Sequence, residues 1–101
     1  MWTERTDPSI LKLIGERIKE IRQQSGMKQS ELAASAGVGL STIAKLEKGQ
    51  SISLLLLVSI MRSLGLLENF ESLLPSPVLS PILRRKMQVR KIIRVRGKHA
   101  E

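Results

Sequence analysis

The chain has 101 residues, of which 42% are apolar, and it carries a formal net charge of +8. This length allows one domain with at most a tail, and with only Trp2 and Phe70 as aromatic residues the core must be built from Leu, Ile, Val and Ala, which favours packed helices. The lack of cysteine excludes a disulfide framework and a thiolate metal site, and the charged start MWTERTDPSI, with no long apolar run after it, predicts a cytoplasmic protein without a membrane span.

The excess of positive charge lies at the C-terminal end of the chain. Residues 84–101 hold eight Lys and Arg against Glu101 alone, whereas residues 1–83 hold nine Lys and Arg against eight Asp and Glu. Such a basic tail suits a polyanion or an acidic protein surface as its partner. A solvated tail that only aids solubility is the alternative.

Five helices are predicted from apolar residues at helical spacing and from the glycine or proline that ends each segment. They are expected within residues 10–26, 28–37, 37–49, 53–65 and 66–74. The predicted fold class is all-α, a compact five-helix domain over residues 10–74. An N-terminal arm (residues 1–9) precedes this domain, and a proline-containing linker and basic tail (residues 75–101) follow it.

The end of the tail does not favour a single structure. Apolar and polar residues alternate over residues 87–90 and again over residues 93–96, which is typical of a strand, but the alternation breaks at Lys91 and Ile92. The same residues also form a basic helix. A third interpretation, which we favour, is that the segment becomes ordered only when it binds a partner.

The most specific pattern lies between the second and third predicted helices. Small Ala33 allows the two helices to approach closely, and Gly37 can take the left-handed conformation that a sharp turn needs. Val38 fills the turn, while Ile43 and Leu46 anchor the third helix against the second. This arrangement is typical of a helix-turn-helix, in which the second helix of the pair enters a DNA major groove.

The stretch IKEIRQQSGMKQSELAASAGVGLSTIAKLEKG (residues 18–49) resembles the phage-repressor-like helix-turn-helix family of Cro/C1 type. The five-helix outline extends this resemblance over residues 10–74. The resemblance implies a sequence-specific DNA-binding domain that acts as a homodimer on palindromic double-stranded DNA, the operator.

The resemblance also implies roles for single residues. It assigns Gln29 to a backbone phosphate. The residues that it places in the major groove are Gly39, Leu40, Ser41, Thr42 and Lys45. The helical period agrees, because Ser41, Lys45 and Lys48 share the face opposite the inward residues. We expect Lys45 to donate to guanine, Ser41 to a base or a phosphate, and Lys48 to a phosphate.

Leu40 and Lys28 depart from the pattern of this family, whereas Arg22 and Glu47 agree with it. Leu40 can touch a thymine methyl group but forms no hydrogen bond, so specificity would also rest on operator shape and dimer spacing. Lys28 cannot accept a hydrogen bond as helix cap, which should cost about 1 kcal/mol. The resemblance implies a buried ion pair between Arg22 and Glu47, with two solvated surface charges as the alternative.

The run LLLLV at residues 54–58 is more apolar than one face of an amphipathic helix requires. Further apolar residues follow in the fifth predicted helix. We therefore expect surplus apolar surface that a second copy covers in a two-fold dimer. Alternatively, a tail that folds back covers this surface.

The sequence contains no Ser–His–Asp set, glycine-rich phosphate loop or metal-ligand cluster, so we expect neither an enzyme nor a cofactor. The predicted function is a transcriptional repressor that binds its own promoter. A looser similarity to HipB-type antitoxins adds a HipA-type kinase toxin as a candidate partner of the protein. This similarity lies in the short repressor-like domain, the fifth helix, the Ser-Pro linker and the basic end. The alternatives are a stand-alone phage-type repressor, a restriction controller protein, and a structural or membrane-surface module that uses only its basic tail.

Overall fold

The computed structural model describes residues 1–77, which form five α-helices and no strand. After one 3-10 turn at Trp2–Glu4, the helices are α1 (Asp7–Gln24), α2 (Gln29–Ala36), α3 (Leu40–Glu47), α4 (Leu54–Ser63) and α5 (Asn69–Leu73). The predicted all-α fold is confirmed. No helix in residues 1–77 combines the length and apolar character needed to cross a bilayer. The basic tail, with its ambiguous end, lies outside the described residues.

Helix α1 begins at Asp7, inside the segment that was assigned to the N-terminal arm. Thr6 caps the helix, since its hydroxyl oxygen accepts a hydrogen bond from the backbone N–H of Ser9 over 3.3 Å. Pro8 lies in the first turn, where its missing N–H removes no helical hydrogen bond. These residues start the helix before its apolar pattern begins, so only residues 1–6 precede it.

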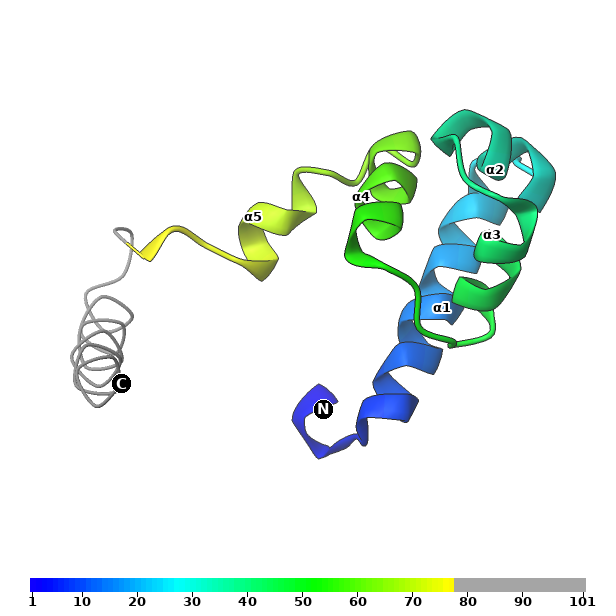
Figure 1. Cartoon of the computed structure of the whole chain (residues 1–101). Helices are drawn as coiled ribbons and strands as arrows, with labels where there is room; N and C mark the ends of the chain where they lie inside the picture. Colours follow the sequence, from blue (N-terminus) through cyan, green and yellow to red (C-terminus); the bar gives the residue numbers. More distant parts are fainter. Residues whose placement is uncertain (78–101) are drawn as a thin grey trace, which may run out of the picture. The chain divides into compact units, whose positions relative to one another are not determined.

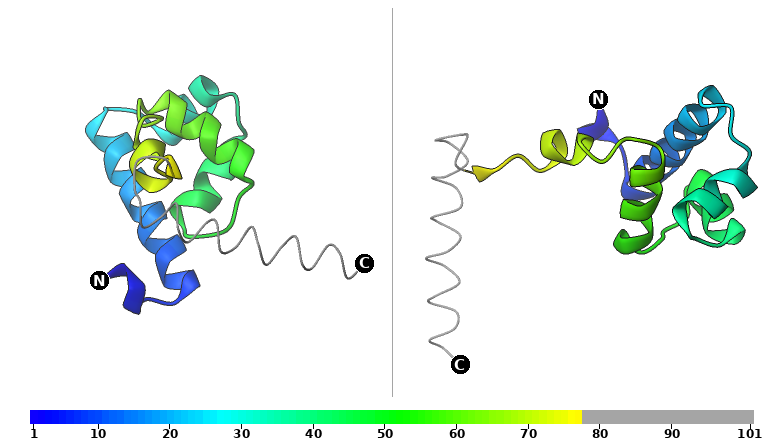
Figure 2. Two further views of the ribbon diagram at one scale, coloured as in Figure 1. Left: turned by 90° about the vertical axis from the view of Figure 1, so that its left-hand side faces the viewer. Right: turned by 90° about the horizontal axis from the view of Figure 1, so that it is seen from above.

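The chain divides into two units, Met1–Leu67 and Glu68–Glu101. Within the first unit, α3 packs against both α1 and α2, and α4 packs against α2 (Figure 1). The N-terminal turns of α1 extend beyond the other three helices of this unit (Figure 2). All five predicted helices are present, with α1 to α4 in the first unit and α5 in the second.

The core of the first unit takes residues from all four of its helices. Its buried apolar side chains are Ile18, Leu32, Ala33, Ile43, Leu46 and Ile60. Ala36 and Val38 pack against this core and are partly buried. Since α2 and α3 supply four of the six residues, burial fixes the same two helices that the sequence identifies as the DNA-binding pair.

Candidate nucleic-acid interface

A left-handed glycine makes the turn between α2 and α3. Gly37 has φ of +69° and ψ of +33°, and the backbone N–H of Val38 donates to the carbonyl oxygen of Ala33 over 3.0 Å. This hydrogen bond closes α2 in the manner of a Schellman cap. Ala33 itself is buried, as the close approach of the two helices requires. The turn therefore fixes the direction in which α3 leaves α2.

Gly39 precedes α3 as its N-cap, with extended backbone angles of −72° and 150°. A Cβ atom on Gly39 would lie 3.6 Å from the Ser41 hydroxyl oxygen and 3.8 Å from that of Thr42, which are ordinary contacts. Neither the backbone angles nor the internal packing requires glycine here. The missing side chain instead leaves the start of α3 open on its outer side.

Helix α3 has one buried face and one exposed face. Ile43 is fully buried and Leu46 is 5% exposed, so these two side chains anchor the helix. Thr42 is half-buried. The exposed members of the predicted DNA-binding set are Gly39, Leu40, Ser41, Lys45 and Lys48. The helix thus presents small, apolar and basic side chains outward, with no exposed carboxylate from α3 among them.

Arg22 and Glu47 form a buried ion pair between α1 and α3. The Arg22 Nε donates to Glu47 Oε2 over 2.7 Å, and its Nη2 donates to Oε1 over 3.1 Å. The Arg22 Nη1 also donates to the carbonyl oxygen of Met27 over 2.7 Å. Both partners are buried, so they are not two solvated surface charges. The pair fixes the C-terminal end of α3 to α1 and to the loop before α2.

The pair holds both side chains in their charged forms. Burial tends to raise the pKa of Glu47, but hydrogen bonds from Arg22 and Gln29, with the charges of Arg22 and Lys19, hold this pKa below its ordinary value. The hydrogen bond with Glu47 raises the pKa of Arg22 although burial opposes this. The Glu47 carboxylate is therefore a structural anion that faces α1 and α2.

Gln29 takes part in the same network. Its Nε2 donates to Glu47 Oε1 over 3.0 Å, a contact that the sequence did not predict. One amide hydrogen of Gln29 is thus used inside the protein. Its second amide hydrogen and its backbone N–H, which has no intrahelical partner at the first position of α2, are the donors that suit a phosphate.

The start of α2 has a cap that compensates in part for Lys28. Lys28 supplies no side-chain acceptor, as its chemistry dictates. Glu31, in the first turn, accepts a hydrogen bond from the backbone N–H of Lys28 over 3.0 Å. This is one half of a capping box, and it satisfies one backbone donor at the helix end.

Two glycines let α1 touch the C-terminal end of α3 backbone to backbone. A Cβ atom on Gly15 would overlap the carbonyl oxygen of Leu46 and lie 2.9 Å from that of Glu47. Gly49 has φ of +86°, and a Cβ atom there would lie 2.7 Å from the Cα atom of Lys12. These contacts define a seam between α1 and α3 that the sequence did not predict. Its one signal is a glycine inside an apolar helical pattern, which weakens a helix unless packing requires it.

Comparison with known families agrees with this geometry. The family model described as helix-turn-helix (HTH_3) matches residues 18–68, half of the chain. Among curated proteins, no sequence matches the chain. The matched stretch contains the turn at Gly37, the exposed face of α3 and the pair of Arg22 with Glu47. The chain therefore belongs to the XRE-type helix-turn-helix family, that of Cro and C1, and is a DNA-binding regulator of transcription.

Proposed function

We propose that the protein is a repressor that reads double-stranded DNA by inserting α3 into the major groove. The observation that carries this proposal is the two-sided character of α3: Ile43 and Leu46 are buried, whereas Ser41 and Lys45 are exposed one turn apart. Side chains four residues apart lie on one face of a helix and can reach neighbouring base pairs. Lys45 donates to guanine O6 or N7, and Ser41 donates to or accepts from a base edge.

We assign the remaining polar groups to backbone phosphates on either side of the groove. Lys48 is exposed directly after the last residue of α3. Gln29 begins α2 and offers its backbone N–H together with the second hydrogen of its side-chain amide. These groups would fix the orientation of α3 but carry no sequence information themselves. Gly39, without a side chain, lets the start of α3 come close to the DNA.

We further propose that the repressor is a homodimer on a palindromic operator. Leu54 and Leu55, at the start of α4, are 69% and 75% exposed, and Leu73 and Leu74 of the second unit are 68% and 72% exposed. Large apolar side chains with this exposure favour association with a second copy. A two-fold dimer would place its two α3 helices in successive major grooves, about 34 Å apart.

The regulatory role that we propose is autorepression, and a second candidate function is that of an antitoxin for a HipA-type kinase toxin. The exposed apolar side chains Leu73 and Leu74 favour this second role, because they offer an apolar protein-binding surface on an element other than α3. Co-expression with a kinase-like neighbour gene tests it. If only homodimer is recovered, the antitoxin role is contradicted, and the protein is a stand-alone repressor or a restriction controller protein.

Selection of bound sequences from a random pool of double-stranded DNA tests the proposed function. The full-length protein should enrich a palindrome whose half-sites are centred about 10 base pairs apart, or a multiple of one turn. A fragment that carries the protein's own promoter should contain that palindrome if the role is autorepression. Failure to enrich any sequence above the starting pool would contradict DNA reading by α3.

A further inference from the structure

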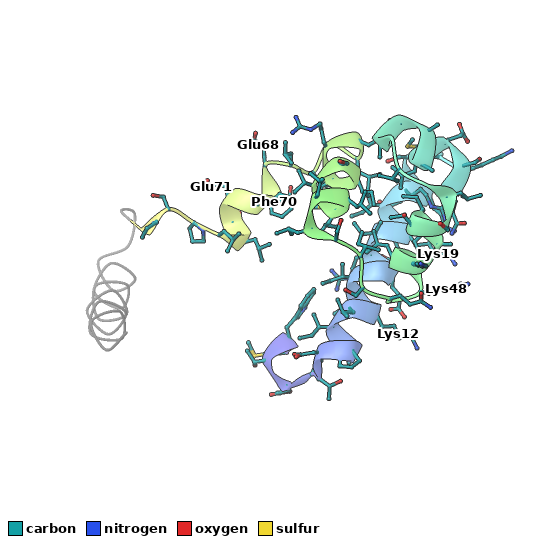
Figure 3. All side chains as sticks on the ribbon, viewed as in Figure 1. Lys12, Lys19, Lys48, Glu68, Phe70 and Glu71 are labelled. Carbon is teal, nitrogen blue, oxygen red and sulfur yellow. The ribbon has the colours of Figure 1, made fainter. Side chains whose placement is uncertain are left out.

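Three lysines lie on one side of the first unit, along the seam between α1 and the C-terminal end of α3. Lys12 and Lys19 come from α1 and Lys48 follows α3, and Figure 3 shows all three on the same side of the unit. All three side chains are exposed. Of the three, only Lys48 belongs to the DNA-binding set predicted from the sequence.

One close approach and one electrostatic effect place the α1 lysines beside the end of α3. The Cα atom of Lys12 lies so near Gly49 that a Cβ atom on that glycine would be 2.7 Å away, and Gly49 directly follows Lys48. About two turns further along α1, the charge of Lys19 contributes to the lowered pKa of Glu47, the residue before Lys48. Lys12 and Lys19 are seven residues apart and therefore share a side of α1.

We propose that Lys12, Lys19 and Lys48 form a phosphate-binding surface that contacts the DNA backbone beside the groove occupied by α3. This inference rests on the proposed function, because it takes α3 as the helix that enters the groove. Lys45 of α3 is assigned to bases, and Lys48, directly after α3, is followed across the seam by Lys12 and Lys19 of α1. Positive charges that lie along one line repel one another, and a polyanion relieves this repulsion. The geometry therefore points to DNA as the partner.

Lys12 precedes the residues that the family model matches, which begin at residue 18. Contacts from this lysine would therefore extend the footprint of the shared helix-turn-helix along one DNA strand. Lys12 and Lys19 would add affinity without sequence preference, because a phosphate is the same at every base pair.

Glu16 lies on the same side of α1, four residues after Lys12 and three before Lys19. Within residues 1–77, it forms an ion pair with neither lysine. A carboxylate that faces a phosphate backbone without a partner weakens binding through repulsion. The proposed surface thus contains an unfavourable charge, and its removal by Glu16→Gln should raise DNA affinity.

The salt dependence of binding to the selected operator tests this inference with the full-length protein. The variants Lys12→Gln and Lys19→Gln should each reduce the slope of log K against log salt by about 0.9, since each lost phosphate contact releases one counterion fewer. Arg17→Gln is the matched control, because Arg17 is also exposed on α1 but lies about 140° around the helix from Lys12. The base preference of both lysine variants should equal that of the wild type.

The outcomes separate this inference from the proposed function. If wild type binds its selected operator but both lysine variants have the same slope as Arg17→Gln, then α1 does not contact phosphate and the inference is overturned. An increase in affinity on Glu16→Gln, together with reduced slopes for the lysine variants, would support it. If the wild type prefers no sequence at all, the proposed function itself fails. Circular dichroism should show equal helix content for the four variants.

Discussion

Gly15 of α1 lies directly against the backbone carbonyl oxygen of Leu46, near the end of α3. No side chain separates the two helices at this point. The buried ion pair of Arg22 with Glu47 joins the same two helices less than two turns further along α1. Backbone contact and ion pair together hold the C-terminal end of α3 against α1, while the turn at Gly37 holds its start. The exposed face of α3 is therefore presented by a helix that is fixed at both ends.

The first prediction concerns this helix contact. Gly15→Ala should lower the free energy of unfolding by about 1–3 kcal/mol, the usual cost of overpacking, because a backbone oxygen cannot move aside as a side chain can. The gain in helix propensity, about 1 kcal/mol, offsets only part of this. Urea denaturation measures the change.

Gly39→Ser is the matched control for Gly15→Ala. The N-cap position has room for a Cβ atom and normal backbone angles, and serine is a good N-cap residue. This variant should keep wild-type stability or gain a few tenths of a kcal/mol, as is typical for glycine and serine caps. Equal stability of the two variants would contradict the close packing of α1 on α3.

The second prediction concerns pH. Because the pKa of Glu47 is below its ordinary value of 4.5 in the folded protein, the unfolded state takes up the proton first as the pH falls. The contribution of the ion pair is complete at neutral pH, decreases below about pH 4.5, and is lost once the pH passes the folded-state pKa.

A nuclear magnetic resonance titration of the Glu47 side-chain carboxyl group should therefore give a midpoint below 4.5. Glu47→Gln should flatten the pH dependence of the free energy of unfolding in this acid range, because it removes the group that titrates. It should also destabilise the protein by about 3–5 kcal/mol at neutral pH, since Arg22 stays buried without its counter-charge. A midpoint at or above the ordinary value would show that burial outweighs the hydrogen bonds from Arg22 and Gln29.

The third prediction concerns the proposed dimer. Leu54 and Leu55 are more than two-thirds exposed, so replacement of both by lysine removes little from the core of the first unit. The Leu54→Lys, Leu55→Lys protein should keep its helix content but sediment as a monomer at concentrations where wild type is a dimer. It should also bind a single half-site as well as wild type does. A variant that still sediments as a dimer would exclude the start of α4 from the interface.

The fourth prediction concerns the basic tail, residues 84–101, which the sequence alone identifies. If six of its eight Lys and Arg contact phosphates, deletion of these residues should reduce the salt slope of DNA binding by about 5 units. The preferred operator sequence should be unchanged, since phosphate contacts do not distinguish bases. An unchanged slope would show that the tail does not contact DNA. Its role would then be to bind a protein partner or to aid solubility.

The sequence predicted the helix-turn-helix well because its requirements are local. The spacing from Ala33 to Gly37 defines the turn, and the apolar period of Ile43 and Leu46 defines which face of α3 is buried. Ser53, directly before α4, likewise caps this helix by accepting a hydrogen bond from the N–H of Leu56 over 3.2 Å. These features depend on residues within a turn or two of one another.

The features that the sequence did not predict depend on contacts between distant segments. Gly15 resembles a weak point in an amphipathic helix until α3 lies against it. The hydrogen bond from Gln29 to Glu47 likewise joins residues 18 positions apart. The early start of α1 is different, because its signal, Thr6 before Pro8, was present in the sequence but lies outside the apolar pattern.

The central claim, that α3 reads bases, is tested most directly by the affinity of the Ser41→Ala, Lys45→Ala protein for the selected operator. Arg62→Ala, an exposed change on α4, is the control. If α3 reads bases, each base contact removed should cost about 1–3 kcal/mol of binding free energy, with little change for the control or for binding to random DNA. An affinity for the operator equal to that of wild type would contradict the claim.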